Sequence, residues 1–200
     1  MTTVPRIGIV IGSTRAARFA DGPTNWLLNI ADKRRDASFE IVDLRDYPMP
    51  FFEEDRSPAF VKPTNEAVAQ WSERMAALDG YIFVTAEYNH SVTGVLKNAL
   101  DYLYPEVNRK PATFLAYGSS GGARAVEHLR HILAEMQVAT IKHTVHVGMI
   151  EMLGMMREGK TMADFPYLVD PAEKMLDEIT WWAKTLRSGR ELAAEEAVAA

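Results

Sequence analysis

Apolar runs alternate with amphipathic stretches along most of the chain. The runs at residues 7–11, 80–85 and 112–117 contain almost no polar side chain, which is typical of parallel strands buried on both faces. Residues 39–44 alternate apolar and acidic side chains, so they are predicted to form a more exposed strand. A fifth strand is predicted over residues 140–147.

Helices are predicted in the intervening and following segments, at residues 21–31, 64–78, 92–103, 123–136 and 170–186. In the first two, apolar side chains recur at helical spacing, which gives each helix a face for packing on a sheet. Asp21 is the expected N-cap of the first helix. Strands that alternate with helices of this length predict an α/β fold, in which helices cover both faces of a parallel sheet.

Three segments break this pattern. Residues 45–63 carry four prolines, which preclude regular structure, and their aromatic side chains suit either a partner surface or a loop folded back on its own core. Residues 148–167 are rich in Met and Gly and are predicted to be irregular. Residues 189–200 are rich in Ala and Glu and are expected to fray, so residues 1–188 are predicted to form a single domain.

Composition narrows the function classes. The chain carries a formal net charge of −5, which argues against a nucleic-acid-binding surface. It has no cysteine, which excludes disulfides, thiolate nucleophiles and cysteine-ligated metals and suits a cytoplasmic protein. No apolar stretch approaches the roughly 20 residues of a membrane span, and the N-terminus lacks the features of a signal peptide.

The loop after the first strand has the chemistry of a phosphate site. It contains Ser13, Thr14 and Arg15, with Arg18 three residues further on. Hydroxyl groups, guanidinium groups and backbone N–H groups at the start of a helix are suited to hold a phosphate. The loop lacks the Gly-Lys-Ser/Thr of a P-loop and the G-x-G-x-x-G of a dinucleotide fold, so a monophosphate is predicted. The alternative is that both arginines are ordinary solvated side chains.

The loop after the third strand, from Ala86, combines one aromatic ring with several hydrogen-bonding groups. Glu87, Tyr88 and Asn89 follow the strand directly, and such a set suits a flat heteroaromatic ligand with polar edges. The alternative is a turn in which Asn89 caps the next helix.

The loop after the fourth strand is Gly118, Ser119, Ser120, Gly121 and Gly122. It matches the G-x-S-x-G pattern of a serine-hydrolase nucleophile elbow. However, every Asp after Ser120 also follows the last histidine, so a triad in the usual chain order cannot be assembled. Consecutive glycines instead allow the backbone to approach a ligand closely. The histidine spacing predicts no metal site.

Together, these three loops resemble those of the NADPH-dependent FMN reductase family of flavodoxin-like proteins. The resemblance implies a three-layer sandwich around a five-stranded parallel sheet of order 2-1-3-4-5. It implies that the first loop holds the FMN phosphate through Ser13, Arg15 and Arg18. It further implies that residues 87–89 line the isoalloxazine ring and that Gly118 to Gly122 embrace its other edge. The family usually has proline at the position of Ala86.

The resemblance also implies an activity. Hydride passes from NADPH or NADH to bound FMN and then to a small acceptor such as a quinone, a metal ion, an azo compound or a flavin. The cofactor carries this chemistry, so no side chain is assigned as catalytic. Members of the family are commonly homodimers or homotetramers. The alternative is a flavodoxin-like electron carrier that binds FMN and does not react with a nicotinamide.

Overall fold

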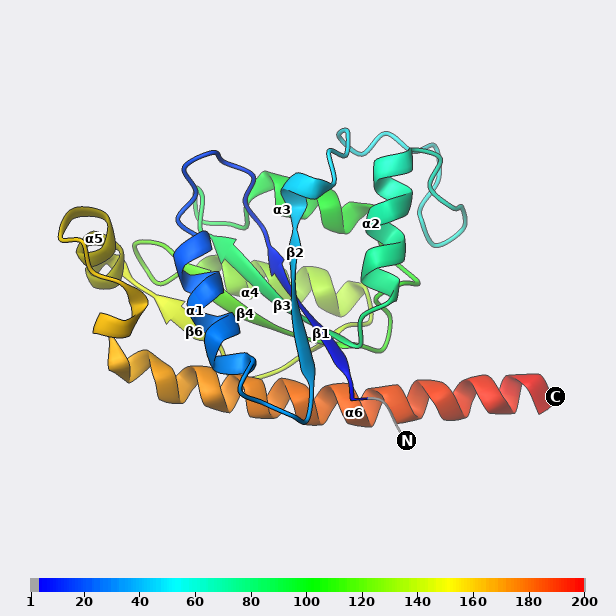
Figure 1. The fold of residues 1–200 in the computed structure, drawn as a ribbon. Coiled ribbons are helices and arrows are strands. Elements are labelled where there is room, and N and C mark those ends of the chain that lie inside the picture. The colour runs from blue at the N-terminus through cyan, green and yellow to red at the C-terminus, as the bar shows by residue number, and fades with distance from the viewer. Residues whose placement is uncertain (1–3, 200) are drawn as a thin grey trace.

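A parallel sheet forms the middle layer of the protein in the computed structural model, which describes residues 4–199 (Figure 1). Its strands are β1 (Arg6–Ile11), β2 (Ser38–Asp43), β3 (Gly80–Ala86), β4 (Pro111–Tyr117), β5 (Ala139–Thr140) and β6 (Val145–Val147). The strand order is β2-β1-β3-β4-β5, and β6 also pairs with β4. The predicted order and the parallel arrangement are therefore confirmed. Every residue of β3 and β4 is buried, as the uninterrupted apolar runs predict.

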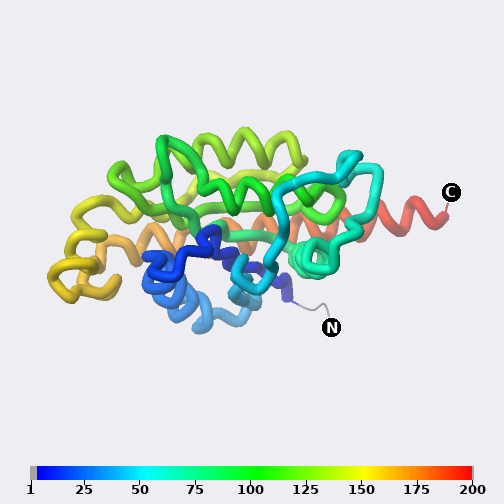
Figure 2. Tube along the Cα trace, turned by 90° about the horizontal axis from the view of Figure 1, so that it is seen from above, coloured from blue at the N-terminus to red at the C-terminus, as the bar shows by residue number. Residues whose placement is uncertain are grey.

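Helices cover both faces of this sheet (Figures 1 and 2). They are α1 (Asp21–Ala31), α2 (Glu66–Ala76), α3 (Gly94–Asp101), α4 (Ala123–Glu135), α5 (Met149–Arg157) and α6 (Val169–Ala199), with short 3-10 turns at Leu44–Asp46, Met162–Asp164 and Pro166–Leu168. One core cluster joins α1 and α6 to one face of the sheet, and a second joins α2, α3 and α4 to the other. The three-layer prediction is confirmed. None of the helices within residues 4–199 is both long enough and apolar enough to cross a membrane.

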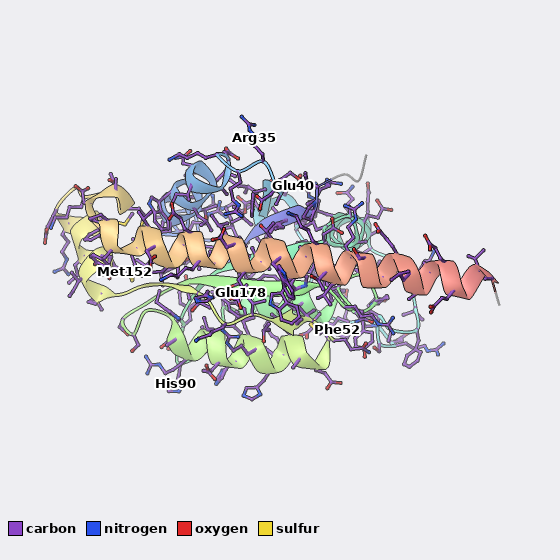
Figure 3. All side chains as sticks on the ribbon, turned by 90° about the horizontal axis from the view of Figure 1, so that it is seen from below. Arg35, Glu40, Phe52, His90, Met152 and Glu178 are labelled. Carbon is purple, nitrogen blue, oxygen red and sulfur yellow. The ribbon has the colours of Figure 1, made fainter. Side chains whose placement is uncertain are left out.

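The fifth strand differs from its prediction because it is divided into β5 and β6. Between the two segments, side chains form hydrogen bonds with backbone groups that would pair with β4 in a continuous strand. The Arg130 guanidinium donates to the carbonyl of Ile141 at 2.8 Å, and the Thr113 hydroxyl donates to that of His143 at 2.6 Å. The His143 N–H donates to the carboxylate of Glu178 on α6 at 2.9 Å (Figure 3).

Residues 148–167, predicted to be irregular, contain α5 and two 3-10 turns. Glu151 in the first turn of α5 accepts a hydrogen bond from the Gly148 N–H at 2.7 Å, which satisfies one backbone donor at the helix start. Gly154 lies against the ring of Phe165, since a Cβ there would be 2.9 Å from that ring. Gly154 therefore allows close packing of a helix against Phe165 and does not mark a loop.

Two helix boundaries also differ from expectation. The helix α6 continues to Ala199 through the segment expected to fray, consistent with the high helix propensity of Ala and Glu, and its last turns extend beyond the sheet (Figure 1). The N-cap of α1 is Ala20 rather than Asp21. The Asp21 carboxylate instead accepts a hydrogen bond from Arg18 at 2.7 Å.

Candidate functional site

The three candidate loops lie side by side at the carboxyl edge of the sheet. Backbone hydrogen bonds continue past the strand ends and join each loop to the neighbouring strand: Gly12 N–H to Val84 O at 2.8 Å, Glu87 N–H to Tyr117 O at 3.0 Å, and Gly118 N–H to Val147 O at 3.2 Å. The resemblance implies that all three loops contact one FMN, and their positions in the structure are consistent with that. Ligands of open parallel sheets bind at this edge.

The first loop presents a set of unused backbone donors. No N–H group of residues 13–17 donates a hydrogen bond within the described part of the chain. Ser13 is buried, and its Oγ makes no hydrogen bond of standard geometry, although it lies near enough to Tyr117 to affect the pKa of that phenol. Because a buried, unpaired hydroxyl costs about 1–3 kcal/mol, this loop is built for a polar ligand. Its donors fit a phosphate group.

Arg18 is buried beneath this loop. Its guanidinium donates to Asp43 at 2.6 and 2.5 Å and to the carbonyl of Ser13 at 2.8 Å, in addition to Asp21. These hydrogen bonds, chiefly those to Asp43, raise the pKa of Arg18. The structure therefore places the Arg18 side chain behind the loop, where it shapes the path of the backbone.

Arg15 points outward on the same loop. Its Nη1 lies 3.3 Å from the hydroxyl of Tyr88, which links the first and second loops. Thr14 is also exposed. Arg45, which the sequence analysis missed, donates to the backbone carbonyls of Arg15 and Ala16, the latter at 3.2 Å. It follows β2 in a segment without a motif, so no sequence signal identified it.

Tyr117 supplies a second buried hydroxyl, next to that of Ser13. It is the last residue of β4, it is 4% exposed, and its Oη makes no hydrogen bond of standard geometry in the described structure. Burial raises the pKa of Tyr117 to about 12, although the nearby Ser13 hydroxyl acts to lower it, so the phenol stays protonated and can donate to a ligand. The only available sequence signal was its position directly before Gly118.

The second loop turns back on itself in a two-residue hairpin. The N–H and carbonyl groups of Tyr88 and Ser91 exchange hydrogen bonds of 3.0 Å. Asn89 and His90 at the tip have φ values of 49° and 73°, the left-handed conformation that such turns require. Strained residues of this kind concentrate at functional sites. The alternative role of Asn89 as a helix cap is wrong, because Thr93 is the N-cap of α3.

Thr93 also fastens α3 to the first loop, and its replacement provides a test of this architecture. The buried hydroxyl donates to the carbonyl of Gly12 at 2.5 Å and accepts from the Leu96 N–H at 3.3 Å. Thr93→Val keeps the shape and removes both bonds. We expect the free energy of unfolding in urea to fall by about 1–3 kcal/mol. An unchanged value would show that the Gly12 carbonyl does not depend on this hydroxyl.

Glu87 connects the second loop to α4. Ala86, which precedes it, is buried at the end of β3. The Glu87 side chain is 4% exposed, and its carboxylate accepts bonds from the Arg124 backbone N–H at 3.1 Å and from the Arg124 guanidinium. The guanidinium also donates to Ser120 and contacts His90, which lies beyond the first turn of α4 (Figure 3). The carboxylate of Glu87 thus faces α4.

The third loop depends on glycine. Gly121 and Gly122 have φ values of +65° and +72°, and a Cβ on Gly122 would lie 2.6 Å from the Cβ of Ala116. Ser119 and Ser120 are exposed, and Ser120 Oγ accepts a bond from Arg124 at 3.0 Å. No histidine contacts Ser120 Oγ among the described residues, which gives no support to a hydrolase. Within residues 4–199, no His, Asp and Glu side chains cluster in a way that could hold a metal ion.

The chain is similar to proteins that are named as FMN reductases and quinone reductases. A family model described as NADPH-dependent FMN reductase matches residues 5–151. An NAD(P)H-dependent FMN reductase of Schizosaccharomyces pombe is 34% identical over 139 residues, which are 68% of this chain and 70% of the relative. A quinone reductase of Escherichia coli is 31% identical over 151 residues, which are 70% of this chain and 74% of the relative.

A solved structure shares the fold. FerB, a flavoenzyme NAD(P)H:(acceptor) oxidoreductase from Paracoccus denitrificans, has a TM-score of 0.68 at 21% identity, with 91% of this chain and 98% of FerB covered. At that identity the likeness concerns the fold, and it extends beyond residue 151 into the region that the family model does not match.

Proposed function

The chain belongs to the NADPH-dependent FMN reductase family, and on that premise we propose that its three loops hold FMN and that it reduces a small acceptor at the expense of NADPH or NADH. The observation that carries the proposal is the pair of buried hydroxyl groups on Ser13 and Tyr117 at the rim where the loops meet, which are close to each other and have no hydrogen bond of standard geometry. At most one of the two hydroxyls can donate to the other, so at least one donor is left for the acceptor oxygens of a phosphorylated ligand. Such groups in a native structure call for an explanation of this kind.

Each loop has a defined part in this proposal. Ser13, Thr14 and Arg15 bind the phosphate together with the free N–H groups of the first loop, and Arg18 maintains the shape of that loop. Residues 86–89 line the ring on one side, and residues 118–122 offer their backbone to its other edge. Hydride acceptance and donation are the chemistry that bound FMN supplies, and the chain contributes binding, orientation and hydrogen bonds.

The acceptor follows from the relatives. A relative named quinone reductase supports a quinone, and the family resemblance extends the candidates to metal ions, azo compounds and free flavin. Anaerobic mixing of the flavin-loaded protein with NADPH or NADH tests the reductase directly. We expect the visible absorbance of the oxidised flavin to disappear without a further protein. If it persists, the protein is an electron carrier of the flavodoxin type.

We further propose that the protein is a homodimer or homotetramer of single-domain subunits in the cytoplasm. Phe51 is 87% exposed, yet its loop is held firmly: the Asn98 amide donates to Pro50 O at 2.7 Å and accepts from the Phe52 N–H at 2.9 Å. Phe52 and Phe60 in the same segment are also exposed, at 37% and 74%, and such a group of exposed aromatic side chains supports a subunit contact. The absence of cysteine in the sequence supports a reducing compartment.

Ser13→Ala separates ligand binding from stability. A hydrogen bond to a charged group is worth about 1.5–3 kcal/mol, so we expect FMN affinity to fall by roughly 10- to 100-fold. The unfolding free energy of FMN-free protein should change by less than about 1 kcal/mol, because the lost hydroxyl has only the Tyr117 hydroxyl nearby and makes no hydrogen bond of standard geometry with it. Fluorescence titration with FMN and urea unfolding measure the two quantities.

Thr180→Val is the matched control for this variant. Thr180 is 2% exposed and its hydroxyl is also without a partner, but it lies in α6, outside the three loops. We expect FMN affinity to be unchanged. Equal affinities of Ser13→Ala and the unsubstituted protein would contradict the assignment of Ser13 to the phosphate.

A further inference from the structure

His146, on β6, contacts the third loop through a single backbone carbonyl. Its Nδ1 lies 2.8 Å from the carbonyl oxygen of Gly121, and its Nε2 lies 2.8 Å from the hydroxyl of Thr144. Because a carbonyl oxygen can only accept, Nδ1 carries the proton, and Nε2 of the neutral ring then accepts the Thr144 hydrogen. The surroundings of His146 therefore select one tautomer.

The fixed carbonyl determines where the next N–H group points. A trans peptide is planar, with its C=O and N–H groups directed to opposite sides, and residues 4–199 contain no cis peptide bond. Since the Gly121 carbonyl faces His146, the Gly122 N–H faces away from it. This N–H donates no hydrogen bond to any described residue. It is a buried donor at the edge of the candidate site.

The peptide between Gly121 and Gly122 needs such an anchor. Glycines on both sides give it more freedom to rotate than any other residue pair. The Gly121 N–H is tied to Gly118 O at 2.9 Å, which fixes the preceding peptide, whereas the Gly121 carbonyl has only the imidazole of His146. Loss of this bond would leave the direction of the Gly122 N–H undetermined before ligand binds.

We propose that His146 is a positioning residue for the cofactor: through the Gly121 carbonyl, it directs the Gly122 N–H toward the flavin. The inference rests on the proposed function, and it assigns a role to a residue outside the three loops. The Thr144 hydroxyl can donate or accept, so it follows the tautomer that the Gly121 carbonyl selects and donates to Nε2.

Two substitutions distinguish the contribution of Nδ1 from that of Nε2. In His146→Asn, the amide nitrogen takes the place of Nδ1 and can still donate to Gly121. In His146→Gln, the amide lies where Nε2 was, so that bond is lost. We expect the dissociation constant for FMN, measured by quenching of FMN fluorescence, to rise roughly tenfold for His146→Gln, as for one lost hydrogen bond, and to stay near the starting value for His146→Asn.

Each outcome of this titration supports or contradicts the positioning role of His146. Rescue by Asn and not by Gln supports the positioning role, which a merely structural contribution would not produce. Equal affinities of both variants, whether high or low, overturn it. If the unsubstituted protein does not bind FMN, the proposed function fails instead. Should His146→Gln not fold, His146→Leu supplies a variant of similar size to His146→Asn without a donor, and a dissociation constant equal to that of His146→Asn also overturns the proposal.

Discussion

Replacement of Gly122 by alanine is expected to abolish FMN binding and to destabilise the protein by about 2–5 kcal/mol. The residue has a φ of +72°, and an added Cβ would lie 2.6 Å from the Cβ of Ala116 and 2.8 Å from the backbone nitrogen of Tyr117. The left-handed backbone costs a non-glycine residue about 1–2 kcal/mol, and overpacking adds about 1–3 kcal/mol. Both neighbours belong to the buried strand β4, so the third loop must move.

Gly159→Ala is the matched control for that experiment. Gly159 has a φ of +70°, close to that of Gly122, but an added Cβ would meet no atom within 4 Å. The unfolding free energy of Gly159→Ala should therefore fall only by the cost of the left-handed backbone, about 1–2 kcal/mol, and FMN affinity should be unaffected. Urea unfolding and FMN titration of the two variants give the comparison. Similar results for both would contradict the close approach of the third loop to β4.

The second large effect is expected from Asp43→Asn. The Arg18 side chain is 4% exposed and that of Asp43 is 20% exposed, so the substitution leaves a buried guanidinium with only part of its charge compensated. Removing one partner of a buried pair typically costs about 3–5 kcal/mol. Because Asp21 still contacts Arg18, we expect a loss of about 2–3 kcal/mol. The first loop would lose its anchor, and FMN affinity should fall with it.

Asp21→Asn provides the control, and pH provides a second test. The Asp21 side chain is 48% exposed, so its substitution should cost less than about 1 kcal/mol. Burial raises the pKa of Asp43, but hydrogen bonds from Arg18 and the Arg45 N–H outweigh burial, and the net pKa is lowered. The stability that Asp43 contributes is therefore present above its ordinary pKa of about 3.9 and is lost as the pH falls through the lower, folded value.

That pH dependence gives a defined expectation. The difference in unfolding free energy between the unsubstituted protein and Asp43→Asn should be constant from pH 5 to 8, a range above both pKa values of Asp43, and should shrink below about pH 4. A difference that is constant down to the lowest pH at which the protein folds would show that the Arg18–Asp43 pair does not stabilise the first loop.

The sequence predicted the elements whose patterns are local. Uninterrupted apolar runs identified β1, β3 and β4, because strands buried on both faces contain few polar side chains. The loops that follow them were identified by glycines and hydroxyl groups. The α5 segment was missed because Gly154, which signals a break in isolation, is accounted for by contact with Phe165.

Contacts between residues that are far apart in the sequence explain the remaining differences between the predicted and the observed site. The sequence placed Arg18 among the phosphate ligands, but its side-chain bonds depend on Asp43, 25 residues away on another strand. The roles proposed for Tyr117 and His146 depend on burial and on a backbone carbonyl, which the sequence does not show. Local patterns therefore located the candidate site, whereas its internal hydrogen bonds required the structure.

The central claim is that three loops at one edge of the sheet bind FMN. Titration of the purified protein with FMN, followed by flavin fluorescence and the visible spectrum, tests that claim most directly. The structure predicts saturable, equimolar binding with release of unmodified FMN on denaturation. A colourless protein that leaves the fluorescence of added FMN unchanged would contradict the account.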